Sequence, residues 1–175
     1  MHQAISFLSA SLFIACASTS TGPAPATVAS PLDVLREGGS FAFSLDESAN
    51  RSAFFHEKCV AKSNGDKAVA DACYAEIAAA GAKEGIRFST DAEGRLVWTS
   101  YGAEGGAEEI YLEAALNAVN DGERGVKATV AAPMHGTMAA THAPPVGKVI
   151  TIEVVDRSTV AMIESEKGRL VYRRR

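Results

Sequence analysis

Hydrophobic and polar residues alternate along most of the chain from Gly85 onward, which is the pattern of half-buried β-strands. The segments at 86–90 and 95–101 flank the turn sequence Asp91-Ala92-Glu93-Gly94, and together they predict a β-hairpin. Four further segments alternate in the same way, at 125–132, 148–155, 158–163 and 168–174. The second half of the chain is therefore expected to be a run of strands, mostly joined by short turns.

The segment at 108–116, EEIYLEAAL, is ambiguous by the same criterion. Its residue types favour a helix, while its apolar residues alternate strictly, at Ile110, Leu112, Ala114 and Leu116. Because the segments on both sides are expected to be strands, we predict a strand here. A helix over 108–118 remains the alternative.

An earlier strand, at 40–45, precedes two segments with helical features. The first helix is expected to begin at Ser48 or Asp46 and to end at about Lys62, before the helix-breaking sequence Asn64-Gly65. The second helix is expected to run from a cap at Asp66 to a stop at Gly81. One face of it carries an apolar stripe, formed by Val69, Cys73, Ile77 and Ala80.

Two cysteines, Cys59 and Cys73, lie in this helical region. In one straight helix they would be ~21 Å apart at 1.5 Å per residue. A disulfide needs a Cα–Cα distance of roughly 4.4–6.8 Å. If they pair, the chain must turn back near Asn64-Gly65, so a disulfide predicts a helical hairpin. Two buried free thiols are the alternative.

These elements predict an α+β fold. About eight consecutive strands form an antiparallel meander, either a curved sheet or a small barrel, because such shapes remove exposed edges. The helical hairpin is inserted after the first strand and is expected to cover one open end or face. The architecture is similar to that of small lipocalin-like barrels of bacterial envelope proteins. If the interior is hollow, Phe41, Phe43 and Trp98 are the expected pocket residues.

The N-terminal region carries an uncharged apolar stretch of 12 residues, from Ala4 to Ala15. It is too short to span a bilayer core and is typical of a secretory signal. The sequence Phe13-Ile14-Ala15-Cys16 resembles the lipobox of a bacterial lipoprotein precursor. The resemblance implies cleavage before Cys16, lipidation of Cys16, and export to the cell membrane or outer membrane. Cleavage at the A-x-A-like sequence Ala15-Cys16-Ala17 and a retained anchor are the alternatives.

A segment rich in Ser, Thr, Pro and Ala follows and carries no charge. It has too little apolar surface to offset the entropy of ordering, so 16–31 is expected to be a flexible tether. The remaining residues, 32–175, are long enough for one globular domain. The formal net charge is −4, whereas nucleic-acid-binding domains carry an excess of Lys and Arg, so the composition does not indicate nucleic-acid binding.

No familiar catalytic motif occurs in the sequence: G-x-S-x-G, H-E-x-x-H, the phosphate-binding G-x-x-x-x-G-K and C-x-x-C are all missing. We therefore name no catalytic residue. One segment, at 133–145, combines thioether and imidazole groups, the ligand types that suit Cu(I), at Met134, His135, Met138 and His142. Gap-filling methionines are the alternative interpretation.

The sequence thus predicts a non-catalytic envelope lipoprotein domain, held to a membrane by its N-terminal lipid. It is expected to act as a binding or structural module whose partner is a small apolar ligand, an envelope polymer or another protein. No cofactor is expected in this interpretation. The alternative is a copper-binding protein that uses the segment at 133–145.

Overall fold

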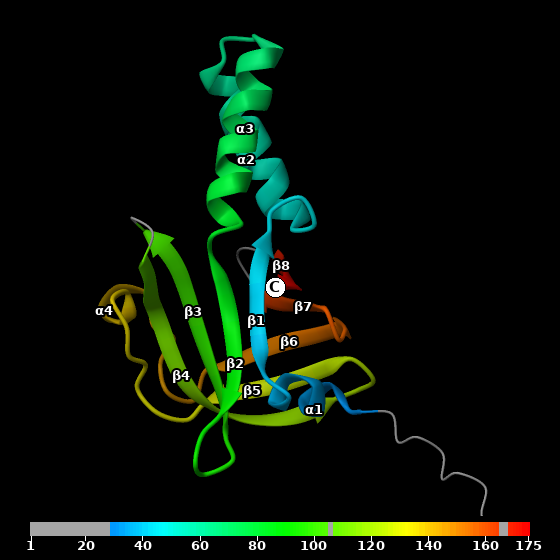
Figure 1. The fold of residues 1–175 in the computed structure, drawn as a ribbon, viewed down its shortest axis with the longest axis vertical. Helices are drawn as coiled ribbons and strands as arrows, with labels where there is room; N and C mark the ends of the chain where they lie inside the picture. The colour runs from blue at the N-terminus through cyan, green and yellow to red at the C-terminus, as the bar shows by residue number, and fades with distance from the viewer. Residues whose placement is uncertain (1–28, 105–106, 165–167) are drawn as a thin grey trace, which may run out of the picture.

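The computed structural model describes residues 29–104, 107–164 and 168–175, and in this part of the chain eight antiparallel strands close into a barrel in chain order (Figure 1). The strands are β1 (Gly39–Ser44), β2 (Gly85–Thr90), β3 (Leu96–Glu104), β4 (Ala107–Asp121), β5 (Gly125–Val130), β6 (Val149–Asp156), β7 (Thr159–Glu164) and β8 (Gly168–Arg174). The first and last strands close the barrel, with Phe43 of β1 opposite Tyr172 of β8. The antiparallel meander is confirmed, and it is a closed barrel.

The ambiguous segment at 108–116 is a strand, since it lies within β4. Ala114 and Leu116 are both buried, and they pair with Trp98 and Leu96 of β3. Alternation therefore outweighed the helical preference of the residue types, because Ala114 and Leu116 are in the core and Leu112 packs against it, although Ile110 is exposed.

One end of the barrel is closed by a short helix, α1 (Pro31–Arg36), which the sequence analysis did not predict. Ser30 caps it, and the side chain of Asp33 returns a hydrogen bond to the Ser30 backbone N–H, which completes a capping box. Leu35 of α1 is fully buried in the barrel core. Ser30 and Pro31, which were placed in the expected tether at 16–31, are the cap and the first residue of this helix.

The helical hairpin between β1 and β2 consists of α2 (Ala49–Lys62) and α3 (Lys67–Gly81) (Figure 1). Asp66 caps α3 through hydrogen bonds from the N–H groups of Ala68 and Val69. Cys59 and Cys73 form a disulfide with a Cα–Cα distance of 5.7 Å. The predicted hairpin and disulfide are both confirmed.

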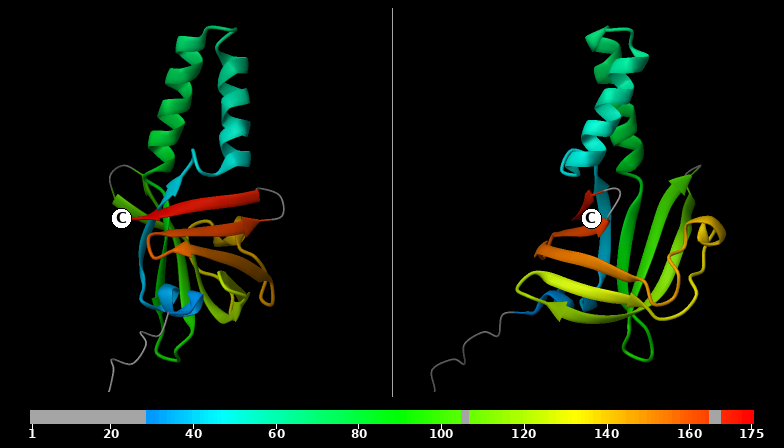
Figure 2. Two further views of the ribbon diagram at one scale, coloured as in Figure 1. Left: turned by 90° about the vertical axis from the view of Figure 1, so that its right-hand side faces the viewer. Right: turned by 180° about the vertical axis from the view of Figure 1, so that it is seen from behind.

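The hairpin projects from the barrel and does not lie across its open end (Figure 2). Val69, which was expected on the buried stripe, is 51% exposed, and Ala70 is buried in its place. Cys59 and Ala70 are the buried residues of the two helices, and Cys59 is joined to the other helix by the disulfide. Among the described residues, no helix is both long and apolar enough to cross a membrane.

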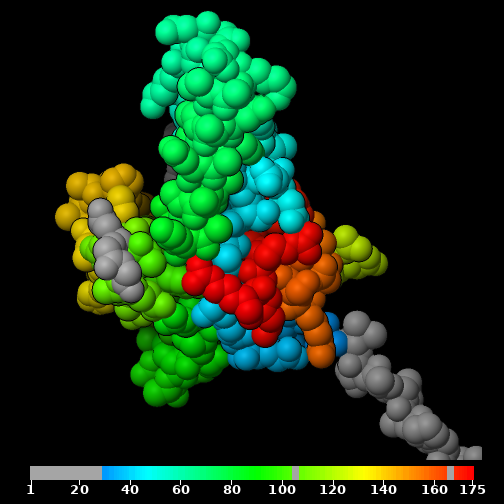
Figure 3. Space-filling view, turned by 45° about the horizontal axis from the view of Figure 1, so that its top comes forward, coloured from blue at the N-terminus to red at the C-terminus, as the bar shows by residue number. Residues whose placement is uncertain are grey.

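The base of the hairpin packs on the barrel, where α2 contacts β8 and α3 contacts β1 (Figure 3). This base lies at the end of the barrel opposite to α1. The two ends of the barrel therefore differ, since one is filled by α1 and the other carries only the base of the hairpin.

Candidate ligand-binding site

A pocket of about 270 Å³ lies at the barrel end from which the hairpin rises, and we call it the mouth pocket. Its wall is formed by strands on several sides of the barrel together with α2. The apolar and aromatic side chains of this wall are Phe43, Phe55, Trp98, Leu112, Met162 and Leu170. The pocket is a continuation of the core into the part of the barrel that α1 does not reach.

The alternation of β3 and β4 explains why space remains there. Trp98 and Ser100 are two residues apart on β3, so both face the interior. Leu112 on β4 lies opposite Ser100. Because Ser100 is small, the barrel interior is incompletely filled next to these larger side chains.

Tyr172 forms a second aromatic contact in the wall, with its ring centroid 5.6 Å from that of Phe43. Burial raises the pKa of the Tyr172 hydroxyl, and the negative charges of Glu164 and Glu84 raise it further. The hydroxyl is therefore protonated throughout the physiological pH range and can donate or accept a hydrogen bond.

Three charged side chains also line the pocket: Arg51 of α2, Glu84 before β2 and Glu164 of β7. The residue Glu84 is exposed, but its carboxyl group is partly desolvated, and this desolvation raises the carboxyl pKa. The positive charge of Arg51 opposes the rise. The guanidinium of Arg51 also lies 6.0 Å from the centroid of the Phe55 ring. The pocket thus has an apolar interior and a charged edge.

Trp98 lines this pocket, but its indole N–H is buried from the pocket as well and has no hydrogen-bond acceptor among the described residues. Trp98 is only 7% exposed, so its Nε1 is buried. A buried donor left without an acceptor costs about 1–3 kcal/mol. The hydroxyl of Tyr101 is also buried without a partner, but it is not part of the pocket wall.

Two of the three predicted pocket residues, Phe43 and Trp98, line the mouth pocket. Phe41 does not, which corrects the prediction for that residue. Phe41 precedes Phe43 by two residues on β1 and therefore lies on the same face of the strand, nearer to α1. It is fully buried and packs edge-on against Phe88, with 6.1 Å between the ring centroids. The core around α1 is filled, so an inward-facing aromatic residue there has no pocket to line.

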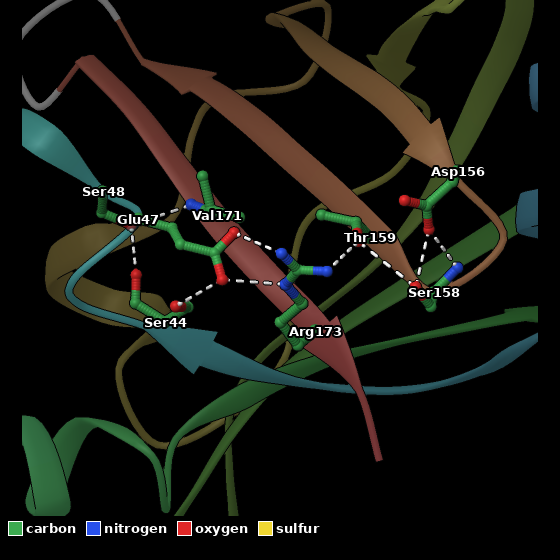
Figure 4. Close-up of polar contacts among 8 residues, drawn as sticks. All are labelled: Ser44, Glu47, Ser48, Asp156, Ser158, Thr159, Val171 and Arg173. Atoms are coloured by element: carbon green, nitrogen blue, oxygen red, sulfur yellow. Dashed lines mark hydrogen bonds and ion pairs between the residues drawn. The ribbon is translucent and has the colours of Figure 1, made fainter.

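A cluster of polar side chains holds the hairpin base on the barrel, and we call it the hairpin-base cluster (Figure 4). Arg173 of β8 donates two hydrogen bonds of 2.8 Å to the carboxylate of Glu47 and one of 2.9 Å to Thr159 Oγ1. Ser48 Oγ donates to the carbonyl of Ser44 and accepts from the N–H of Val171. These hydrogen bonds hold the segment at 44–48, which leads into α2, against β8.

This attachment matters for the pocket, because the first turns of α2 supply Arg51 and Phe55 to its wall. The hydrogen bond from Arg173 is the main reason that the pKa of Glu47 lies below its ordinary value. No local pattern marks Arg51, Glu84 or Phe55 as pocket residues, since their role depends on how the hairpin is held.

The segment at 133–145 does not bring its four predicted copper ligands into one environment. Met134 is buried in the barrel core, while His135, Met138 and His142 are exposed. Part of the segment is the short helix α4 (Ala139–His142). No cluster of three or more His, Cys, Asp or Glu side chains suited to a metal occurs in the described ranges. Copper binding stays an untested prediction.

The same segment has a structural role at the edge of β4. β5 pairs with β4 only from Leu116 to Asp121, so the first half of β4 needs another partner. His135 exchanges two backbone hydrogen bonds with Glu113, of 2.8 and 3.0 Å, and Met138 donates to the carbonyl of Tyr111. The segment thus covers a strand edge that would otherwise be open.

The predicted signal sequence, Cys16 and the tether up to residue 28 lie outside the described residues. No protein family, curated protein or solved structure matches this chain.

Proposed function

We propose that this protein binds a small, largely apolar molecule in the mouth pocket and performs no reaction on it. The observation that carries the proposal is the pocket itself, a volume of about 270 Å³ walled by aromatic and aliphatic side chains inside a closed barrel. Barrels of eight strands have an interior that side chains can fill or that can hold one small ligand. Here α1 fills one end, and the other end stays hollow.

The size of the pocket limits the ligand. Its volume corresponds to roughly nine water molecules at the density of the liquid. Pockets for drug-sized ligands begin at about 300 Å³. The ligand is therefore small, such as a short acyl chain or a single ring system, or it is the end of a longer molecule whose remainder projects past the hairpin.

The side chains of the wall support binding without catalysis. Among the described residues that line the pocket, the hydroxyls are those of Ser100 and Tyr172, and no histidine or cysteine is present. Ser100 thus has no imidazole beside it to act as a base, and the pKa of Tyr172 is raised. Neither hydroxyl is activated as a nucleophile.

Titration with the neutral fluorescent probe N-phenyl-1-naphthylamine tests this function, because Trp98 is the only tryptophan of the chain. Binding in the pocket should quench Trp98 emission by energy transfer. Ser100→Phe places a ring in the pocket and should abolish the quenching. Ser89→Phe makes the same change at an exposed position on β2 and is the matched control. Equal probe affinity in all three proteins would contradict the proposal.

We further propose that the domain is an envelope lipoprotein anchored through Cys16. The lipobox-like sequence Phe13–Cys16 supports this, and so does the disulfide, because disulfides persist in oxidising compartments. Cys16→Ser should move the protein from the membrane fraction to the soluble fraction. An intact mass that corresponds to an unmodified chain beginning at Ser18 would favour plain secretion instead.

A further inference from the structure

We propose that two copies of this protein associate through the outer face of α2, with their hairpins antiparallel. The face is a stripe at helical spacing, which we call the α2 stripe, and it consists of Phe54, Glu57, Lys58 and Ala61. It shares no residue with the wall of the mouth pocket. The inference therefore concerns a second surface of the molecule and does not depend on the proposed function.

The α2 stripe is open to a partner. The hairpin stands clear of the barrel (Figure 2), and Cys59, on the other side of α2, is buried and joined to α3 by the disulfide. Phe54 is 46% exposed, and the other three residues of the stripe are exposed too. Together the four residues line a surface hollow of about 280 Å³. A single exposed ring needs no explanation by itself, but the charges beside it indicate what would cover it.

The order of residues makes the α2 stripe complementary to itself. When two copies of a helix pack antiparallel about a two-fold axis, each position before the axis lies opposite the position equally far behind it. With the axis between positions 57 and 58, Glu57 of each copy faces Lys58 of the other, which gives two ion pairs. Phe54 of each copy then faces Ala61 of the other, so the ring packs where the opposing side chain is only a methyl group.

A single copy leaves the two charges of the stripe unpaired. Glu57 and Lys58 are adjacent and so do not face each other on the helix, and neither forms an ion pair elsewhere in the described ranges. The ammonium of Lys58 lies 5.3 Å from the centroid of the Phe54 ring, which keeps it on the stripe. A second copy supplies a partner for both charges, whereas an apolar helix or a lipid tail would supply neither.

The same alignment fits the shape of the hairpin. It places Gly65, in the turn between α2 and α3, beside Asn50 of the other copy, where α2 begins. Asn50 packs next to Gly168 at the start of β8, so the turn of each hairpin ends where the other barrel begins. The two barrels therefore lie at opposite ends of a bundle of four helices.

The size of the contact limits the strength of the dimer. It comprises one helix of 14 residues from each copy, which is ~21 Å long. Interfaces below about 1,200 Å² are typical of transient complexes, so we expect the dimer to dissociate on dilution. Because its charges are exposed, added salt should weaken it further.

Exchange of the two charges tests the inference. Glu57→Lys makes the centre of the stripe wholly positive and Lys58→Glu makes it wholly negative, so each variant alone should dimerise at least ~10-fold more weakly than the original stripe. An equal mixture of the two variants should associate again, because both ion pairs then join opposite charges. Sedimentation velocity of the Cys16→Ser protein, which lacks the proposed lipid, measures each dissociation constant. Both positions are exposed and Glu and Lys have similar helix propensities, so the variants should fold.

Matched controls make the same changes of net charge on the barrel, at the exposed positions Glu123→Lys and Lys148→Glu. They should leave the dissociation constant within a factor of about three, alone and mixed, as expected for charges outside the interface. A monomer at every concentration up to ~1 mM, a range that includes transient complexes, would overturn the inference. So would equal dimerisation of Glu57→Lys and the original stripe, or a mixture that associates no better than the separate variants.

Discussion

The disulfide between Cys59 and Cys73 should stabilise the helical hairpin and not the barrel. The closed loop runs from residue 59 to residue 73, and the chain-entropy estimate for a loop of about 15 residues is ~3 kcal/mol. The hairpin has little else to hold it, because the helices bury few apolar side chains and meet the barrel through their base. Isolated helices of this length are marginal in water.

Reduction of the disulfide should therefore open the hairpin without unfolding the barrel. A loss of ~3 kcal/mol raises the opening equilibrium by a factor of roughly 150. Amide hydrogen exchange in α2 and α3 should accelerate by about that factor on reduction. The amides of Ile86, Ile152 and Val160, whose side chains are almost fully buried in the barrel, should keep their exchange rates.

A double variant provides the control for the chemistry of reduction. Cys59→Ala combined with Cys73→Ala should match the reduced protein, since both lack the covalent link. If the amide of Ile152 accelerates as much as those of α2, the hairpin and the barrel unfold as one unit and the reasoning is wrong. Unchanged exchange in α2 and α3 would contradict it as well, because the bond would then contribute nothing.

Three further predictions concern α1, the hairpin base and copper. Leu35→Ala should lower the free energy of unfolding by about 2–5 kcal/mol in urea titrations, since Leu35 is fully buried in the core, and a loss under about 1 kcal/mol would contradict this role of α1. Arg173→Gln should lower the free energy of unfolding only slightly, because the ion pair with Glu47 is largely exposed. Arg173 holds the pKa of Glu47 below its ordinary value of 4.5. The part of the cost that comes from the ion pair should therefore be present above pH 4.5 and be lost as pH falls through the lower pKa, and an undiminished cost at pH 2 would argue against the ion pair. If the segment at 133–145 binds Cu(I), His135→Ala with His142→Ala should remove near-stoichiometric binding, and equal affinity in both proteins would exclude the copper site.

The strands and the hairpin could be predicted because their signals are local. Alternation places every second residue of a strand in the core, and β4 followed this rule against the helical preference of its residues. Asp66 caps α3, while Ser48 stands at the N-terminus of α2 without a capping hydrogen bond from its side chain. α1 could have been predicted too, because Ser30, Pro31 and Asp33 have the spacing of a capping box with proline at the first helical position.

The pocket could be predicted only in part, because it depends on contacts between distant segments. Phe41 and Phe43 have the same alternation and the same residue type, and only the position of α1 makes one a core residue and the other a pocket residue. Arg51 enters the wall through the hydrogen bonds that Arg173, near the other end of the chain, makes at the hairpin base. Sequence spacing carries no information on either arrangement.

The pairing of β1 with β8 has a consequence for how the protein folds. Every other neighbouring pair of strands in the barrel is also adjacent along the described chain, but closure joins its first and last strands. Loop-closure entropy opposes such a long-range contact until β2 to β7 have formed, so we expect closure to come late and folding to take milliseconds to seconds. Until β8 is in place, β1 and β7 each present an unpaired edge to any other chain nearby. A chain that stops before Gly168 should therefore aggregate and not remain a smaller soluble domain.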